Sequence, residues 1–540
     1  MKNFLVFFLI MCGISNAYSQ YSNDPHNPLV VSTHNGNMSN IRIATTENGT
    51  TFIAEEQIDL IANEGKINVC ILDSNGNIIS NSIGISYSIG NKPENDFNLV
   101  SSGYNVLLSF GGNLFFKLHH QGGFTLIELQ FDSAKLVEDP IIAGTSVDIN
   151  DENEIVFAVP FLNDLYINKL TPDGDIASSG NVIDGYNTMP KVCFIEDGSF
   201  YVVYRIYERL YADYYDKNCN NVWKAIYVGH ETGSDLSHNE PHQIIPDGLG
   251  GIYVIWKKKN IYVQRITTED NGFEITGIRK FTDYGMELTE NTTECYNPLV
   301  SVDKNTNDLN ITWRSQNQNT NSVNLQKITP DGEKTWGTNG IIVDESILSH
   351  HNTPAAIGTA GDKIVLVFSK YNTTSQDYDL VYNRYYIGTG NKDFADNIDV
   401  NISKYKRNSV VATDFINNQI VVAWSDSTND EQVRTLAQNI TYNGILGPDT
   451  LSINDEEASI CSVFPLPASD EINIKYISKS TTIATIQIFD YLGKLVFEEN
   501  NFDLNIGENI ITINKIFPVG EYNILLTAGS EKITQKVIFK

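Results

Sequence analysis

The nine residues Asn305–Trp313, NTNDLNITW, decide the fold, because they join a polar turn to a strand that ends in a large aromatic residue. Apolar Leu309, Ile311 and Trp313 alternate with polar residues, which is the period of a β-strand, and the preceding Asn and Asp residues are typical of a tight turn. Clear copies of this unit are EDGSFYVVY (196–204), GLGGIYVIW (248–256), TAGDKIVLVF (359–368) and FINNQIVVAW (415–424), and weaker copies are ENGTTFIAE (47–55), GYNVLLSF (103–110) and DENEIVFAV (151–159).

These eight copies recur about every 50 residues, and each is followed by further alternating segments such as VNLQKI (323–328) and IYVQRI (261–266). A four-stranded antiparallel unit at this period, with no helical segment between copies, is the signature of a β-propeller blade. We therefore expect an all-β chain that begins with a propeller of eight four-stranded blades, with seven as the alternative. The last residue of each second strand should be a wedge between blades: Glu55, Phe110, Val159, Tyr204, Trp256, Trp313, Phe368 and Trp424.

Two features of the propeller stay open in the sequence. Residues 28–32 either supply an outer strand to the last blade or form a tail. The segments after Trp313 and Phe368 are long and polar, so we expect long loops between the second and third strands there, on a variable face where a ligand would bind.

The composition excludes some partners. The 540 residues include 66 acidic and 37 basic ones, a net charge of −29, and this field repels nucleic acid. Met1–Ala17 has the basic, apolar and small-residue order of a signal peptide, with residue 19 as the alternative end. No later stretch approaches the length of a transmembrane helix, so we expect an exported chain without an integral membrane segment.

After an acidic stretch at 455–457 the repeat stops, and a compact all-β pattern follows that suggests a small β-sandwich. Its segments are VFPLPASDEINI (463–474), IQIFDYLGKLV (486–496), GENIITINKIFPVGEYNILL (507–526) and the basic end KVIFK (536–540). In this order and at the C-terminus they resemble the C-terminal sorting domain of the type IX secretion system. The family usually has Asn between the two prolines, where this chain has Leu466.

The resemblance implies export across both membranes, recognition by the type IX secretion machinery and a final location at the cell surface or outside the cell. The upstream repeats also look like the propeller arrays that often precede such domains. The expected organisation is a signal peptide at 1–17, a propeller at 28–455, a linker at 456–462 and a sorting domain at 463–540. The positions that match the sorting motif are Pro465, Pro467, Asp490, Gly493, Lys494, Gly507, Gly520, Tyr522 and Lys540.

The ligand site is predicted on the loop-rich face. Tyr207 is flanked by Arg205 and Arg209 between two predicted strands, and exposed tyrosine beside arginine suits recognition of sugars or peptides. The next connector, HETGSDLSHNEPH (230–242), adds His230, His238 and His242. We expect these six residues to form one patch. The three histidines and the carboxylates of the connector could hold zinc, but their spacing is irregular and favours an ordinary solvated loop.

Two turns carry oxygen ligands at alternate positions, Asp73–Asn77 and Asp303–Asp308. Calcium loops share this pattern, but so do hairpin turns chosen for their backbone conformation. We predict no cofactor, with calcium at these turns as the alternative.

The sequence favours a binding or interaction protein with a glycan or peptide ligand. The alternative is a surface hydrolase acting on glycans, with catalytic carboxylates such as Glu208, Glu231 or Asp235 on the loop face. No nucleophile elbow or phosphate loop supports catalysis, so whether the chain is an enzyme, which residues would be catalytic, and its oligomeric state stay open.

Overall fold

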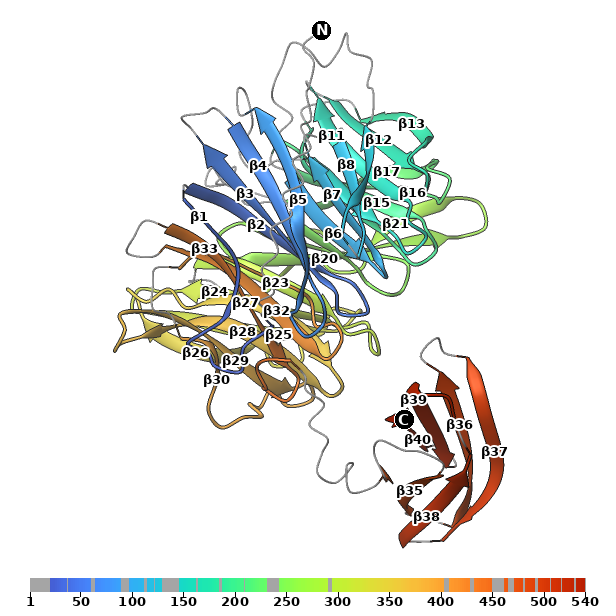
Figure 1. Cartoon of the computed structure of the whole chain (residues 1–540). Helices are drawn as coiled ribbons and strands as arrows, with labels where there is room; N and C mark the ends of the chain where they lie inside the picture. Colours follow the sequence, from blue (N-terminus) through green and yellow to red (C-terminus); the bar gives the residue numbers. More distant parts are fainter. Residues whose placement is uncertain are drawn as a thin grey trace. The chain divides into compact units, whose positions relative to one another are not determined.

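The structure is a computed structural model of the 540-residue chain. It describes residues 20–35, 37–59, 64–88, 97–110, 114–120, 122–128, 145–161, 164–183, 187–207, 209–230, 242–289, 294–402, 407–427, 432–448, 461–464, 471–478, 481–490, 494–505, 507–515, 517–528 and 531–539. The chain divides into two compact units, Met1–Pro448 and Asp449–Lys540, which we call the propeller unit and the tail unit (Figure 1). All regular secondary structure among the described residues is β-strand, as expected.

The propeller unit is built from consecutive antiparallel sheets. The first two contain β2 (Asn37–Thr45), β3 (Thr51–Asp59), β4 (Glu64–Leu72), β5 (Ile78–Ser88), β6 (Phe97–Ser102), β7 (Asn105–Phe110), β8 (Leu114–Leu118) and β9 (Phe124–Glu128). The next two contain β10 (Ser146–Ile149), β11 (Ile155–Phe161), β12 (Asp164–Leu170), β13 (Ile176–Ile183), β14 (Asn187–Phe194), β15 (Phe200–Ile206), β16 (Arg209–Tyr215) and β17 (Asn221–His230).

The second half of the propeller unit repeats the arrangement. Its first two sheets contain β18 (Gln243–Pro246), β19 (Ile252–Lys257), β20 (Ile261–Asp270), β21 (Ile275–Arg279), the short β22 (Met286–Glu287), β23 (Glu294–Val302), β24 (Leu309–Gln316), β25 (Thr320–Ile328) and β26 (Ile341–Ile347). Its last two contain β27 (Thr353–Ala360), β28 (Lys363–Asn372), β29 (Asp377–Tyr386), β30 (Ile398–Asn401), β31 (Arg407–Ala412), β32 (Gln419–Ser427), β33 (Gln432–Thr441) and β1 (Leu29–Asn35).

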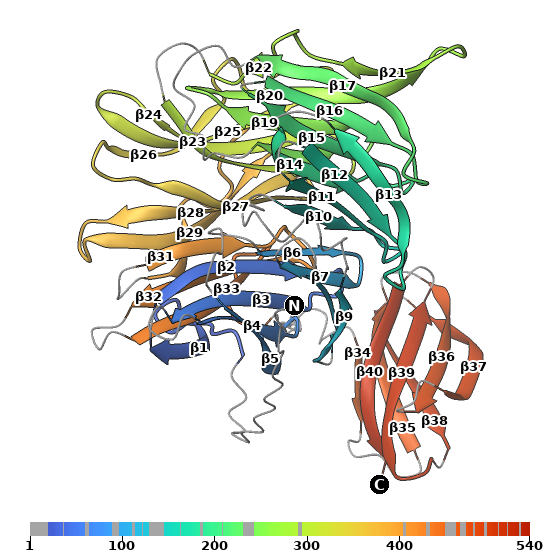
Figure 2. The ribbon, with the colours of Figure 1, turned by 90° about the horizontal axis from the view of Figure 1, so that it is seen from above.

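The first strands of these sheets lie side by side in a closed ring. Contacts run in order through β2, β6, β10, β14, β18, β23, β27 and β31, and β31 contacts β2 again. In Figure 2 the sheets of the propeller unit fan out around a common centre. This arrangement is a β-propeller. Within the described residues the ring holds eight sheets.

The strand β24 shows why such a sequence packs this way. Leu309, Ile311 and Trp313 are buried, but so are the polar residues between them. The Asn310 amide donates to Thr359 Oγ1 of a neighbouring sheet at 2.8 Å, and Thr312 Oγ1 donates to the Asn324 carbonyl at 2.7 Å. Because a blade is covered on both faces, its polar positions must find partners inside the protein.

The N-terminal segment closes the ring. β1 pairs antiparallel with β33, and Leu29 lies opposite Ala437. Residues 28–32 therefore lead into an outer strand of the last sheet rather than a tail. The first strand of the described residues completes a sheet whose other strands come about 400 residues later, so folding of the ring joins the two ends of the propeller unit.

The expected long loops after Trp313 and Phe368 are wrong. β24 continues to Gln316 and β25 begins at Thr320, while β28 continues to Asn372 and β29 begins at Asp377. Polar residues such as Ser315 and Ser322 lie opposite each other in these extensions. Backbone hydrogen bonds hold a strand pair together whatever the side chains, so a polar segment is not by itself a loop.

The tail unit has two sheets, with strand orders β34-β35-β38 and β37-β36-β39-β40. The strands are β34 (Cys461–Phe464), β35 (Glu471–Ser478), β36 (Thr482–Asp490), β37 (Leu495–Leu504), β38 (Gly507–Asn514), β39 (Gly520–Ala528) and β40 (Glu531–Phe539). Buried residues of both sheets, including Ile474, Ile488 and Leu526, form one hydrophobic cluster. The last described propeller residue is Pro448, and residues 456–460 of the expected linker lie outside the described residues.

Candidate functional site

The Tyr207 turn holds an exposed aromatic ring in an unusual backbone conformation. Ile206 pairs with Arg209, so the hairpin between β15 and β16 has two residues at its tip. Such tight hairpins favour left-handed backbone angles, which Asn and Gly adopt most easily. Tyr207 has a φ of 54° and a side chain 73% exposed. Arg209 beside it is also exposed.

The other described members of the predicted patch lie deeper, and here the sequence prediction is corrected. Arg205 is within strand β15, not on a loop, and is only 8% exposed. His242 is buried, and its Nε2 lies 3.2 Å from the Val203 carbonyl, to which it donates. Burial, and then the charges of Lys191 and Arg205, lower the pKa of His242 to about 3, so its imidazole is neutral. Arg205 pairs with Leu210 within the hairpin and its side chain lies inside the protein, whereas Tyr207 lies at the exposed tip.

Several predicted residues lie outside what the structure describes. These are the side chain of His230, all of His238, and the carboxylates proposed for a hydrolase, Glu208, Glu231 and Asp235. The predicted patch of six residues therefore stays a prediction, with Tyr207 and Arg209 as its exposed described members.

The two calcium-like turns use their oxygen atoms internally. Asp73 Oδ1 accepts from the backbone N–H groups of Asn75 and Asn77 at 2.9 and 2.8 Å. Asp303 Oδ1 accepts from the Asn305 N–H at 2.9 Å, and Asp308 pairs with Lys327 at 2.7 Å. Across the described residues, no cluster of three or more His, Cys, Asp or Glu side chains is placed to hold a metal ion. In both turns the Asp and Asn side chains stabilise the backbone conformation of the turn, as expected for hairpin turns.

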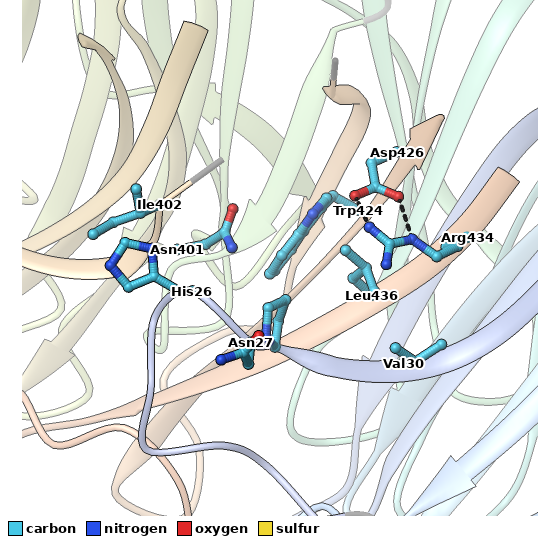
Figure 3. Close-up of a pocket in the computed structure, with 10 residues that line it drawn as sticks. His26, Asn27, Val30, Asn401, Ile402, Trp424, Asp426, Arg434 and Leu436 are labelled. Atoms are coloured by element: carbon cyan, nitrogen blue, oxygen red, sulfur yellow. Dashed lines mark hydrogen bonds and ion pairs between the residues drawn. The ribbon is translucent and has the colours of Figure 1, made fainter. Parts of the chain in front are cut away.

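A pocket that the sequence did not reveal lies beside the closure of the propeller (Figure 3). Its volume is about 300 Å³. We call it the strap pocket, because one wall is the N-terminal strap, residues Tyr21–Pro28. Its lining residues are His26, Asn27, Pro28, Val30, Asn401, Ile402, Trp424, Asp426, Arg434 and Leu436.

Strand register builds the inner wall. Trp424 lies opposite Leu436, which lies opposite Val30, so three strands contribute an apolar row. Two residues further along the same face, Asp426 lies opposite Arg434. The guanidinium donates through Nε to Asp426 Oδ1 at 3.0 Å and through Nη2 to Oδ2 at 2.7 Å, a bidentate pair. This pair fixes a charged edge beside the apolar row.

The strap forms the opposite wall and is fastened by backbone contacts. The Pro25 carbonyl accepts from the Ile402 N–H at 3.0 Å and from the Asn401 amide at 3.1 Å. The Gln438 amide donates to the Ser22 carbonyl at 2.6 Å. His26 and Asn27 are exposed, and in Figure 3 His26 lies beside Ile402, across Trp424 from the Asp426–Arg434 pair.

The described lining of the strap pocket offers both apolar surface and hydrogen-bonding groups. Apolar Trp424, Leu436 and Val30 offer a surface for the carbon face of a ligand, while guanidinium, amide and imidazole groups offer hydrogen bonds. Among the described lining residues Asp426 is the one carboxylate, and Arg434 donates to both its oxygens. The sequence contained one signal for this pocket: Trp424 ends a predicted strand, and Asp426 follows it on the same face. The strap that forms the other wall lies about 400 residues earlier in the chain, so the sequence did not connect the two.

Several residues of the predicted sorting motif lie at defined positions in the strands of the tail unit. Tyr522 in β39 is buried and donates to the Pro518 carbonyl at 2.9 Å, and its ring contacts Phe517 and Phe539. Gly520 and Gly507 begin strands, Asp490 ends β36, and Gly507 has a φ of 95°. Lys494 is exposed. Pro465, Pro467, Gly493 and Lys540 lie outside the described residues.

Solved structures with some likeness to the chain share little sequence with it. An endo-arabinase from Bacteroides thetaiotaomicron is 9% identical, with a TM-score of 0.24, 46% of this chain and 92% of that one covered. A GH32 β-fructofuranosidase from Bombyx mori is 11% identical, with a TM-score of 0.24 and coverage of 65% and 86%. An acylaminoacyl peptidase from Pyrococcus horikoshii is 9% identical, with a TM-score of 0.35 and coverage of 74% and 58%. At these scores the likeness supports no inference about activity.

A comparison with curated protein sequences finds no match. No helix among the described residues is long and apolar enough to cross a membrane. Residues 462–540, by contrast, match the family described as the secretion system C-terminal sorting domain. The tail unit is therefore a type IX secretion C-terminal sorting domain, which interacts with the secretion machinery, and the protein is exported to the cell surface or the extracellular space.

Proposed function

We propose that the protein is an exported β-propeller that binds a glycan or peptide, with one polar group of the ligand seated in the strap pocket. The observation that carries the proposal is the combination, in one pocket of about 300 Å³, of an apolar row, a bidentate ion pair and exposed amide and imidazole groups. Small-ligand sites have this composition, and the volume is at the lower end of their usual range. It suits a single sugar ring or side chain.

The alternative, a surface hydrolase acting on glycans, needs more carboxylates than the described lining of this pocket provides. Glycoside hydrolysis generally uses two carboxyl groups on either side of the scissile bond. In the strap pocket Asp426 is held by Arg434. A hydrolase would have to use another part of the loop face, where its proposed residues Glu208, Glu231 and Asp235 belong.

The Tyr207 turn is a second candidate seat for the ligand. A tyrosine at a left-handed backbone position carries a local conformational cost, and the Tyr207 side chain is 73% exposed. Exposed tyrosine next to Arg209 can stack on a sugar ring or a peptide side chain.

The test is a glycan and peptide array with the full chain, followed by titration of each hit against two double variants, His26→Ala with Asn27→Ala and Tyr207→Ala with Arg209→Ala. All four residues are exposed, so both variants should melt like the parent. If the strap pocket is the seat, the first variant binds about tenfold more weakly and the second is unchanged. If instead only the Tyr207 and Arg209 variant binds more weakly, the ligand binds at the Tyr207 turn. Cleavage of an array hit, or hits that neither variant weakens, would contradict the proposal.

A further inference from the structure

Two cationic side chains share a face of the fourth sheet, near the centre of the propeller. Lys191 lies in the innermost strand β14, directly opposite Val203 of β15, and Arg205 follows Val203 by two residues. Opposite residues, and residues two apart on a strand, point to the same face. A β-bulge precedes Lys191, with Met189 at a φ of 53°, and bulges of this kind re-aim the side chains beside them.

A histidine from the next sheet completes this cluster. His242 precedes β18 and donates its Nε2 hydrogen to the carbonyl of Val203, the residue opposite Lys191. The His242 imidazole therefore contacts the backbone at the residue opposite Lys191, and Arg205 follows that residue by two positions. Arg42 of β2, another innermost strand, lowers the pKa of Lys191. We call Lys191 and Arg205, with the neutral His242 against the Val203 backbone, the inner cationic cluster.

No acidic side chain of the described residues neutralises the two central cations. The structure records no ion pair or hydrogen bond for the Lys191 ammonium within that part of the chain, and Arg205 Nε is buried without a hydrogen-bond partner. Burial is the main cause that lowers the pKa of Lys191. Arg42 donates to the carbonyl of its neighbour Ile41 and lies 5.2 Å from the Phe97 ring.

This arrangement is costly in the protein alone. Arg205 is buried and Lys191 is half-buried, so each cation loses hydration without a counter-charge among the described residues, and the second cation adds repulsion. The chain has 66 acidic residues against 37 basic ones, so carboxylates are abundant, yet the described ones leave this place positive. An anion bound between the cations would remove both costs.

We infer that Lys191 and Arg205 form a binding site for a carboxylate or sulfate group at the inner edge of the propeller. The guanidinium can meet such a group through two hydrogen bonds, and the ammonium adds a point charge. The neutral imidazole of His242 holds the Val203 backbone between them and adds no third charge. The site is separate from the strap pocket, so the inference does not rest on the proposed function.

The experiment titrates the full chain with inorganic sulfate and with glucuronate, against sodium chloride at equal low ionic strength, by calorimetry and thermal melting. Low salt is needed because screening weakens the attraction. The variants are Lys191→Met and Arg205→Gln, with Lys217→Met as the matched control, since Lys217 is an exposed lysine of the same sheet region. We expect saturable binding of at least one anion by the parent and the control. Both cluster variants should bind about tenfold more weakly or worse.

Stability gives an independent readout. Without an anion, Lys191→Met should melt at or above the parent temperature, because the change removes a half-buried charge that has no counter-charge among the described residues. Binding of glucuronate alone would point to a carboxylate-bearing sugar, and binding of both probes to oxyanions in general. The inference is overturned if neither probe binds more tightly than chloride, or if the anions stabilise the parent and the cluster variants equally. Should Lys191→Met fail to fold, Lys191→Gln and Arg205→Gln still decide the binding result.

Discussion

Tyr207 shows how one residue can carry a conformational cost in a stable fold. Its φ of 54° lies where side chains beyond Gly, Asn and Asp are disfavoured. The hairpin of β15 and β16 nevertheless keeps it there, because Ile206 and Arg209 pair on either side. The strain and the exposure of the ring can be separated experimentally.

We predict that Tyr207→Asn raises the free energy of unfolding by about 1 kcal/mol, because asparagine adopts the left-handed conformation more easily. Thermal or urea unfolding measures this directly. If the turn is the ligand seat, the same variant binds an array hit more weakly although it is more stable. A variant that is less stable than the parent would show that the ring contributes packing that its 73% exposure hides.

His242 predicts a pH dependence with a defined sign. Its pKa is lowered from 6.5 to about 3 in the folded protein, by burial first and then by Lys191 and Arg205. The unfolded chain therefore binds more protons between these values, so the contribution is fully present above pH 6.5 and is lost as the pH falls towards 3. The slope is at most about 1.4 kcal/mol per pH unit.

The variant His242→Gln isolates this effect. Glutamine can still donate to the Val203 carbonyl but does not titrate. Urea unfolding at several pH values should show a shallower loss of stability for His242→Gln than for the parent across this window. If the stability of the two proteins falls equally with pH, the imidazole of His242 is exposed to solvent or protonated in the folded state.

Among the elements, the seam between the last and first sheets departs from the repeat. At the position where other blades carry buried aromatic residues such as Trp313, the first blade carries Glu55, 3% exposed. Its Oε2 accepts from Ser32 of β1 at 2.6 Å and from Thr435 of β33, and its Oε1 accepts from Gln57 at 3.1 Å. The Glu55 carboxylate thus links the first sheet to two strands of the last sheet, β1 and β33.

We predict that Glu55→Ala lowers the free energy of unfolding by about 2 kcal/mol, because it removes the acceptor of the buried Thr435 hydroxyl and of the half-buried Ser32 and Gln57 donors. Glu64→Ala is the matched control, as Glu64 is an exposed residue of the same sheet, and should change little. Chemical unfolding of the two variants measures the difference. Equal stabilities would show that the seam is held by β1 pairing alone.

At the scale of the whole molecule, the two units have separate cores and separate tasks. The tail cluster contains residues from Ile472 to Phe539, while the propeller clusters draw on earlier residues alone. Each unit therefore buries its own apolar surface, which is the physical condition for folding independently.

We predict that a chain ending at Ile460 folds with the melting temperature of the propeller unit unchanged but is retained within the cell envelope. The reason is that the secretion machinery recognises the sorting domain, whereas the propeller core does not include it. Cell fractionation with circular dichroism of the purified variant checks both parts. Surface display of the shortened chain at the parental level would contradict the sorting role, and loss of folding would contradict the unit boundary.

The blade number is a prediction of the same scale. The repeat and the closed ring of innermost strands lead us to expect eight blades. A crystal or electron cryomicroscopy structure with seven radial sheets would contradict it.

The sequence by itself determined what depends on residues close together in the chain. The NTNDLNITW repeat specifies hairpins and wedges such as Trp313, and the motifs around Gly507 and Tyr522 identify the sorting domain, because alternation, turns and short motifs act locally. It could not distinguish a polar loop from a polar strand extension, nor tell that Arg205 lies inside a strand, since side-chain polarity does not fix where backbone pairing ends.

Only the tertiary structure decided the sites. The strap pocket joins His26 to Arg434, the seam joins Ser32 to Thr435 through Glu55, and the inner cationic cluster brings His242 of one sheet to Val203, opposite Lys191, of another. Ring closure and the packing of neighbouring sheets bring together residues that lie far apart in the chain, and no local pattern records which side chains will meet. The burial of these side chains, and hence the energetic cost of burying their charges, follows from that packing.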